Sequence, residues 1–317
     1  MRKIAYVFPG QGSQYVGMAK DFYHNYSCAK DVFQCANKIL KYDIAELCFE
    51  GPIESLSATE NCQPAIITAS IACLAVLDEL LKKESVSSVA GHSLGEYSAL
   101  VAANALDLES ALLLVKKRGL FIQEASQQYP GTMAAIIGLD AEQVKDICKT
   151  SSINGVVRIA NYNCPGQIVI SGEHKAIDKA IEEAIAAGAR KAIKLEVSGP
   201  FHSCLMQSAE KKLYDELKGL NIKKANIPLY ANVYAKPITQ PSNIKEALSR
   251  QVTGSVLWED SIKNMISAGI RTFIEVGPKR VLSGLISRID KKVQVLNVND
   301  EQSLNKTKDT LNFSSKC

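Results

Sequence analysis

The sequence lacks the cysteine spacing of a structural zinc site. It has nine cysteines, an odd number, yet no two of them form a C-x-x-C pair. Cysteines scattered in this way through a long chain predict reduced, mostly buried thiols and a cytoplasmic protein. We therefore expect neither a bound metal nor a disulfide framework.

The sequence also lacks a strong excess of charge and a long apolar run. A formal net charge of +4 argues against a dedicated nucleic-acid binder, but it allows an acidic partner or a phosphate-bearing substrate. The first apolar run ends at Pro9 and is too short for a signal peptide. The longest one, residues 64–77, is shorter than a bilayer span and contains Thr68 and Ser70. We expect this stretch to be a buried helix and the protein to have no membrane partner.

A G-x-S-x-G pentapeptide at residues 91–95 is the most informative feature that is present. Residues 86–90 predict a strand before it and residues 94–105 a helix after it. A serine on such a sharp turn projects its hydroxyl group, and the free N–H groups of the following helix can hold an oxyanion. Ser93 and Glu96 also match a capping box, in which the serine would only cap the helix.

A nucleophilic serine needs a base, and the chain has only four histidines. We expect His24 on the surface and His174 at the start of a helix. His92 adjoins Ser93 on a strand, where neighbouring side chains point to opposite faces. His202, which follows a Gly-Pro turn, is therefore the candidate base, although a purely structural histidine remains an alternative.

The pattern of elements predicts an α/β fold with two domains. The order β-α-β-β-α-β indicates a small ferredoxin-like α+β domain at residues 129–198. It is inserted into a large α/β-hydrolase-like domain with a parallel sheet, residues 1–128 and 199–317. Strands are expected at 3–8, 86–90, 132–139, 156–160, 167–171, 191–197, 228–233, 272–276 and 293–298, with a turn at 161–166. Helices are expected within 15–47 and at 63–82, 94–105, 108–128, 141–150, 174–187, 202–217, 246–268 and 303–311.

Five motifs in this order resemble those of the malonyl-CoA:acyl-carrier-protein transacylases, the malonyl loaders of fatty-acid synthesis. The resemblance extends from about residue 3 to residue 311. The motifs are FPGQGSQ (8–14), GHSLGE (91–96), KRG (117–119), PFHS (200–203) and EVGP (275–278). The combination is far more specific than any one of them.

The resemblance implies a role for each of these site residues. Ser93 would attack the thioester carbonyl, and His202 would take its proton and return it to the departing thiol. The backbone N–H groups of Gln11 and Leu94 would form the oxyanion hole. The backbone carbonyl of Gln251 would orient the histidine, so that no aspartate is needed.

Arg118 would then bind the free carboxylate that distinguishes malonyl from acetyl, because a guanidinium group pairs with a carboxylate bidentately. Its neighbours Lys116 and Lys117 are instead typical of a solvated helix face. The helical register places Arg118 on one stripe with Leu113, Leu114 and Phe121, and this favours an inward position.

Two further substrate-binding residues are implied. Phe201 resembles the residue of malonyl-selective members, whereas those that take branched methylmalonyl usually carry a smaller side chain there. Asn163 matches a polar turn near the site, and its precise role is left open.

The implied substrates are malonyl-CoA and the phosphopantetheine thiol of an acidic acyl carrier protein. No cofactor, nucleic acid or membrane is implied, and we expect a monomer. Candidate docking cations are Lys116, Lys117, Lys191, Lys194, Lys279 and Arg280. A serine hydrolase or thioesterase, a catalytically silent scaffold that binds the carrier protein, and an enzyme for another acyl group remain alternatives.

Overall fold

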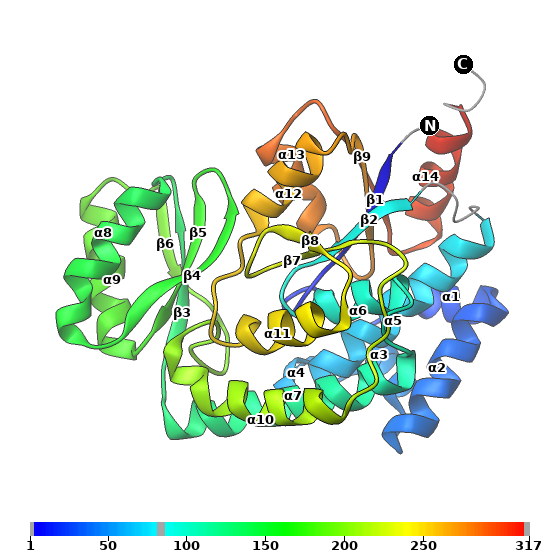
Figure 1. Cartoon of the computed structure of the whole chain (residues 1–317), viewed down its shortest axis with the longest axis horizontal. Coiled ribbons are helices and arrows are strands. Elements are labelled where there is room, and N and C mark those ends of the chain that lie inside the picture. The colour runs from blue at the N-terminus through cyan, green and yellow to red at the C-terminus, as the bar shows by residue number, and fades with distance from the viewer. Residues whose placement is uncertain (1–2, 81–85, 314–317) are drawn as a thin grey trace.

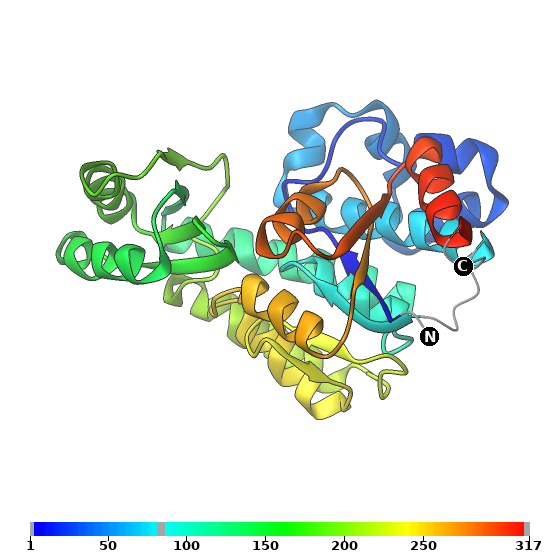
Figure 2. The same ribbon diagram turned by 90° about the horizontal axis from the view of Figure 1, so that it is seen from above.

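The fold is built around two β-sheets, which lie apart in the molecule (Figure 1). The computed structural model describes residues 3–80 and 86–313. The smaller sheet is formed within residues 132–194, and the chain before and after this segment forms the larger one. Figure 2 shows the same arrangement from above, with the green segment extending from one side.

The larger sheet has the strand order β10-β9-β1-β2-β7-β8. Neighbouring strands are parallel, except that the edge strand β8 is antiparallel to β7. The carboxyl ends of the parallel strands therefore meet at one edge, where open α/β sheets bind their ligands. The strands are β1 (Ile4–Phe8), β2 (Val86–Gly91), β7 (Leu229–Ala231), β8 (Lys236–Ile238), β9 (Thr272–Val276) and β10 (Gln294–Val298).

Helices pack around the larger sheet, and the apolar helix α5 lies at the centre of their core against α2 and α7. Within the described residues, α5 alone is long and apolar enough to span a membrane. However, 83% of its most apolar window is buried in the fold, as expected for a core helix. The helices are α1 (Lys20–Asn25), α2 (Ser27–Leu40), α3 (Ile44–Glu50), α4 (Ile53–Ser57), α5 (Thr59–Leu80), α6 (Gly95–Ala102), α7 (Leu108–Gln128), the 3₁₀ turn η3 (Cys204–Met206), α10 (Gln207–Gly219), α11 (Pro241–Gln251), α12 (Trp258–Ser267), α13 (Val281–Ile289) and α14 (Glu301–Phe313).

The smaller sheet is antiparallel and has the order β4-β5-β3-β6. Two helices cover one of its faces with apolar side chains. The other face carries Met133, Ala160 and Val169, which pack near Phe201. The elements are β3 (Thr132–Ile137), α8 (Ala141–Ser151), η2 (Ser152–Asn154), β4 (Val157–Cys164), β5 (Gln167–Gly172), α9 (His174–Ala186) and β6 (Lys191–Lys194), so the predicted order is confirmed.

The predicted turn at residues 161–166 is wrong. Strand β4 continues to Cys164, and only Pro165 and Gly166 form the turn. Pairing with β5 explains the difference, because Asn161, Tyr162 and Cys164 all lie opposite residues of that strand. Val256 adds a bridge to Asn161, and its carbonyl accepts a hydrogen bond from the N–H of Tyr162.

Three predicted helices also have different bounds. The helix predicted at 202–217 begins at Gln207, because His202 has a left-handed φ of 58° that no helix accommodates. The helix predicted at 246–268 is two helices, α11 and α12. The helix predicted at 63–82 begins at Thr59 and so places Pro64 in its second turn, while residues 81–82 lie outside the described residues. Helices α4 and α13 and strand β8 were not predicted.

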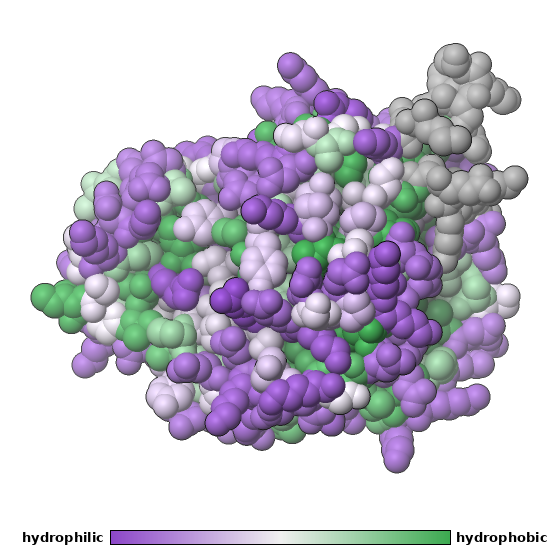
Figure 3. Space-filling view, viewed as in Figure 1, coloured by the Kyte–Doolittle hydropathy of each residue, from purple (hydrophilic) through white to green (hydrophobic). Residues whose placement is uncertain are grey.

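Polar side chains cover most of the face shown in Figure 3, and apolar residues are scattered over it. The eight cysteines within the described ranges are all free thiols. The same residues contain no group of three histidine, cysteine or carboxylate side chains that could hold a metal ion.

Candidate active site

The G-x-S-x-G segment forms a sharp turn between β2 and α6. Ser93 lies at its tip with a φ of 50°, a strained conformation that a residue other than glycine keeps only under tertiary restraint. Both glycines are needed for packing. A Cβ on Gly91 would lie 1.9 Å from the carbonyl carbon of Gly95, and a Cβ on Gly95 would lie 2.1 Å from the carbonyl oxygen of Phe8. The helix therefore starts directly against β1 and β2.

Ser93 and His202 form a hydrogen-bonded pair. The distance from Ser93 Oγ to His202 Nε2 is 2.8 Å. On the other side of the ring, His202 Nδ1 lies 2.8 Å from the carbonyl oxygen of Gln251 and 3.1 Å from that of Gly254. Because carbonyl oxygens only accept, Nδ1 must carry the proton, which leaves Nε2 free to accept the serine proton.

The structure does not show the helix cap that Ser93 and Glu96 could have formed. No side-chain cap is formed at the start of α6, whose N-cap residue is Leu94. The carboxylate of Glu96 instead accepts from the backbone N–H of Asn232, at 2.5 Å. Of the other histidines, His24 and His174 are exposed, and Nε2 of His92 lies 2.8 Å from Oδ1 of Asn163.

The turn after β1 lies directly beside Ser93. It is closed by the hydrogen bond from Ser13 N–H to the carbonyl of Gly10, at 3.2 Å, and Gln11 occupies its tip. A Cβ on Gly10 would lie 2.4 Å from the carbonyl oxygen of His92, so the two turns are in contact. Gln11 and Leu94 both line the cavity around the serine.

Arg118 reaches the same serine from the middle of α7. Its NH2 group lies 3.4 Å from Ser93 Oγ and 3.2 Å from Gln251 Oε1, and NH1 donates to Gln63 Oε1 at 2.9 Å. The side chain is 4% exposed, so the expected inward position is confirmed. Leu113, which we expected on the same inward stripe, is 42% exposed. Within the described part of the chain, Arg118 forms no ion pair and its Nε has no acceptor, so this buried cation can accommodate an anion.

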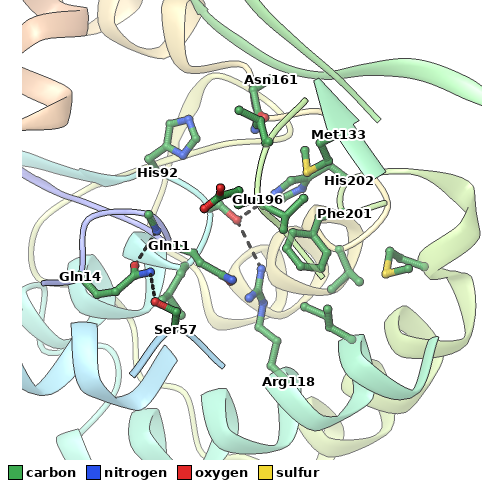
Figure 4. A pocket seen from close by; sticks show the side chains of 18 residues that line it. Gln11, Gln14, Ser57, His92, Arg118, Met133, Asn161, Glu196, Phe201 and His202 are labelled. Carbon is green, nitrogen blue, oxygen red and sulfur yellow. Dashed lines mark hydrogen bonds between the residues drawn. The ribbon is translucent and has the colours of Figure 1, made fainter. Parts of the chain in front are cut away.

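The cavity above these groups has a volume of about 540 Å³ (Figure 4). One wall is apolar, whereas the turn after β1 contributes Gln11 and Gln14. The figure shows His202 and Arg118 converging on the serine oxygen, which dashed lines join to both. The apolar wall consists of Ile122, Met133, Leu195, Val197, Phe201, Met206 and Val252.

The three remaining predicted site residues lie in different places. Phe201 lines the cavity. Gln251 is buried behind it, where its carbonyl contacts His202 and its side chain contacts Arg118. Asn163 is not on the cavity wall; it lies in β4 and binds His92, and the cavity-lining asparagine is Asn161. The prediction of a polar turn at Asn163 failed because β4 continues through it.

Comparison with known proteins agrees with this geometry. Residues 5–313 match the family model described as an acyl transferase domain. The malonyl CoA-acyl carrier protein transacylase of Bacillus subtilis (strain 168) is 46% identical over 307 residues, 96% of each chain. The chain belongs to the malonyl CoA-acyl carrier protein transacylase family and is an acyltransferase.

Solved structures of this family have the same mixed α/β fold. That of the transacylase from Clostridium perfringens ATCC 13124 aligns with a TM-score of 0.94 at 46% identity, covering 99% of this chain and 98% of its own. A malonyl-transacylase solved in complex with a type II polyketide acyl-carrier protein aligns with a TM-score of 0.94 at 39% identity, covering 97% and 99%.

Burial controls the charges of this acyltransferase site. Burial, and then the positive charge of Arg118, lower the pKa of His202 to about 3. The imidazole is therefore neutral at physiological pH, as a general base requires. Burial also lowers the pKa of Arg118, but a guanidinium group remains charged.

Sequence reasoning missed Gln63, Asn232 and the true role of Glu96. Asn232 Oδ1 accepts from the N–H of Ser93 at 2.7 Å, and its Nδ2 donates to the carbonyl of Gly91 at 2.7 Å. Its position directly after β7, at the carboxyl edge of the parallel sheet, is a usable signal. Gln63 lies directly before the apolar stretch of α5 and is fully buried, and a buried polar side chain usually has a partner.

Proposed function

We propose that this acyltransferase moves the malonyl group from malonyl-CoA to the phosphopantetheine thiol of an acyl carrier protein in fatty-acid biosynthesis. The contact of Ser93 Oγ with His202 Nε2, at 2.8 Å, carries the proposal. The position of Arg118 NH2, 3.4 Å from the same oxygen, supports a substrate that ends in a carboxylate.

The reaction proceeds by two matched acyl transfers through a malonyl-serine. Ser93 Oγ attacks the thioester carbonyl while its proton passes to His202 Nε2. The backbone N–H groups of Gln11 and Leu94 stabilise the tetrahedral oxyanion. The carbon–sulfur bond then breaks, and the proton on His202 goes to the departing CoA sulfur. In the second half, the carrier thiol gives its proton to His202 and attacks the ester carbonyl. The carbon–oxygen ester bond then breaks, and His202 returns the proton to Ser93 Oγ.

Selectivity for the malonyl group comes from the residues around the acyl chain. The Arg118 guanidinium pairs with the malonyl carboxylate, and the bulk of Phe201 opposes a branched substituent. Gln251 fixes His202 through its carbonyl, and Asn163 acts on the site through His92. These steps need no metal or other cofactor.

An acidic, phosphopantetheinylated carrier protein is the proposed acyl acceptor. Among the candidate cations, Lys279 lies beside the cavity, because its Nζ donates to the carbonyl of Gly12 at 3.1 Å, and Gly12 lines the cavity. Lys117 and Lys194 instead pair with Glu216 and Asp178. Lys279 is thus the strongest candidate for carrier docking.

We also propose the finer architecture and setting of the protein. Residues 1–128 and 199–317 form a large α/β-hydrolase-like domain, and residues 129–198 form a ferredoxin-like domain. The strand order β4-β5-β3-β6 with two helices on one face supports the second description. We propose a cytoplasmic monomer without nucleic-acid or membrane partners.

The experiment that tests this function uses labelled malonyl-CoA with and without holo carrier protein. We expect stable labelling of the wild-type protein, none of the Ser93→Ala variant, and transfer of the label to the carrier. Rapid CoA release without a carrier protein would favour a hydrolase, and an unlabelled wild-type protein would favour a scaffold. Methylmalonyl-CoA and acetyl-CoA, run in parallel, test the choice of acyl group.

A further inference from the structure

One buried carboxylate lies behind the active site without facing the cavity. Glu96, in the first turn of α6, is 1% exposed. Its Oε1 accepts from the backbone N–H of Asn232 at 2.5 Å, and its Oε2 accepts from Nε2 of Gln251. Both carboxylate oxygens are therefore occupied by N–H donors, from a segment after β7 and from the end of α11.

The same two partners hold the backbone of Ser93 from both sides. Asn232 accepts from its N–H at 2.7 Å, and Gln251 Nε2 donates to its carbonyl oxygen at 2.9 Å. Ser93 is the strained residue of the turn, and such strain persists only where the surroundings over-determine the conformation. Glu96 anchors both groups that restrain the nucleophile.

Glu96 also determines which way the amide of Gln251 points. An ionised carboxylate is an acceptor only, so the NH2 group of Gln251 must face it. The Gln251 oxygen is thereby directed to Arg118 NH2, at 3.2 Å. If the amide were reversed, its NH2 group would face the guanidinium, and two donors would oppose each other.

We propose that Glu96 is a positioning residue that sets both the geometry of the nucleophile and the orientation of the carboxylate-binding arginine. Its effect passes through Asn232 and Gln251, and it touches neither the acyl group nor the reacting atoms. This inference rests on the proposed malonyl transfer and extends it to a residue outside the cavity.

The test is the variant Glu96→Gln, which keeps the shape and replaces one accepting oxygen by a donating NH2 group. That group opposes either the Asn232 N–H or the Gln251 amide. The matched control is Glu275→Gln, because Glu275 is also fully buried and accepts from the N–H groups of Leu282 and Ser283, at 2.9 and 2.6 Å. Wild type and both variants are assayed at pH 9, where Glu96 with its pKa of about 8 is ionised, for formation of the acyl-enzyme from malonyl-CoA and from acetyl-CoA, with thermal unfolding in parallel.

In Glu96→Gln we expect kcat/KM to fall about tenfold to a hundredfold for malonyl-CoA, and less for acetyl-CoA, as one buried hydrogen bond is replaced by a clash. The malonyl-to-acetyl ratio therefore falls, whereas in Glu275→Gln it stays at the wild-type value even if the melting temperature drops. Equal losses for both donors in Glu96→Gln, or no loss, would overturn the proposal. A wild type that forms no malonyl-enzyme would instead refute the proposed function itself.

A pH profile gives a second readout that a purely structural carboxylate would not move. Burial raises the pKa of Glu96 to about 8. The hydrogen bonds from Asn232 and Gln251 and the positive charge of Arg118 lower this pKa, but by less. The other titratable group beside it, Tyr97, has its pKa raised to about 12 by burial, and His202 stays neutral. The wild-type malonyl-to-acetyl ratio should therefore fall as the pH drops from 9 to 7, while that of Glu96→Gln stays flat. A wild-type ratio that does not change with pH would count against the inference.

Discussion

Replacement of Arg118 by alanine gives the most direct test of how the site selects its acyl group. The guanidinium group is buried, and both its terminal nitrogens already form hydrogen bonds within the site. A malonyl carboxylate can accept two charge-assisted hydrogen bonds from it, each worth about 1.5–3 kcal/mol. Together they contribute about 3–6 kcal/mol, which corresponds to a loss of about 10²- to 10⁴-fold in kcat/KM.

The assay for Arg118→Ala is rapid-quench measurement of acyl-enzyme formation from malonyl-CoA and from acetyl-CoA, without carrier protein. We expect acetyl transfer to stay constant or to rise, because acetyl has no carboxylate. The matched control is Lys117→Ala, which removes a neighbouring cation whose side chain is 51% exposed and pairs with Glu216 at the surface. Equal losses for both donors in Arg118→Ala would refute the selectivity argument, as would a loss for malonyl in the control.

Three further changes test other parts of the fold. Gly91→Ala should abolish activity and lower the melting temperature, because the new Cβ would lie 1.9 Å from the carbonyl carbon of Gly95; a fully active variant would contradict this packing. Gly284→Ala should raise the free energy of unfolding by about 0.5–1 kcal/mol, since this exposed residue of α13 has open space around it. The pKa of His202 is lowered on folding, so its contribution to stability is present above pH 6.5 and is lost as the pH falls towards 3. Between pH 6.5 and 3, the free energy of unfolding of the wild type should fall by about 1.4 kcal/mol per pH unit more than that of His202→Gln, as measured by denaturant unfolding. If the free energies of both proteins fell in parallel with pH, the pKa shift would be contradicted.

Much of the fold could be predicted because the deciding signals are local. The helix at residues 108–128 and the strand at 272–276 were predicted with the bounds of α7 and β9. In α7, Asp107 caps the first turn by accepting from the N–H of Ser110, a pattern readable from the sequence. The antiparallel segment was also found, because its strands and helices alternate at short spacing.

The errors arose where distant segments decide the structure. Asn163 was expected in a turn, but the residues around it pair with β5, and Asn161 also bridges to the distant Val256. The start of α10 was placed too early because His202 has a left-handed φ of 58°, and its ring contacts the carbonyl groups of residues 251 and 254. The spacing of residues in the sequence does not reveal such long-range contacts. For the same reason the contacts of Glu96 were not predicted, because Glu96 also matches a capping box with Ser93.

The active site thus brings together two residues, Ser93 and His202, that both have a left-handed backbone conformation. Each such conformation costs of the order of 1–3 kcal/mol, so each needs restraints that a flexible loop does not supply. For Ser93 they come from Asn232 and Gln251, which bond to its backbone, whereas the carbonyls of Gln251 and Gly254 hold the ring of His202. Gln251 belongs to both sets, and its side chain also contacts Arg118. A change in the position of this one residue would therefore alter the geometry of Ser93, His202 and Arg118 together, so the tests of the proposed function lie behind the cavity as well as within it.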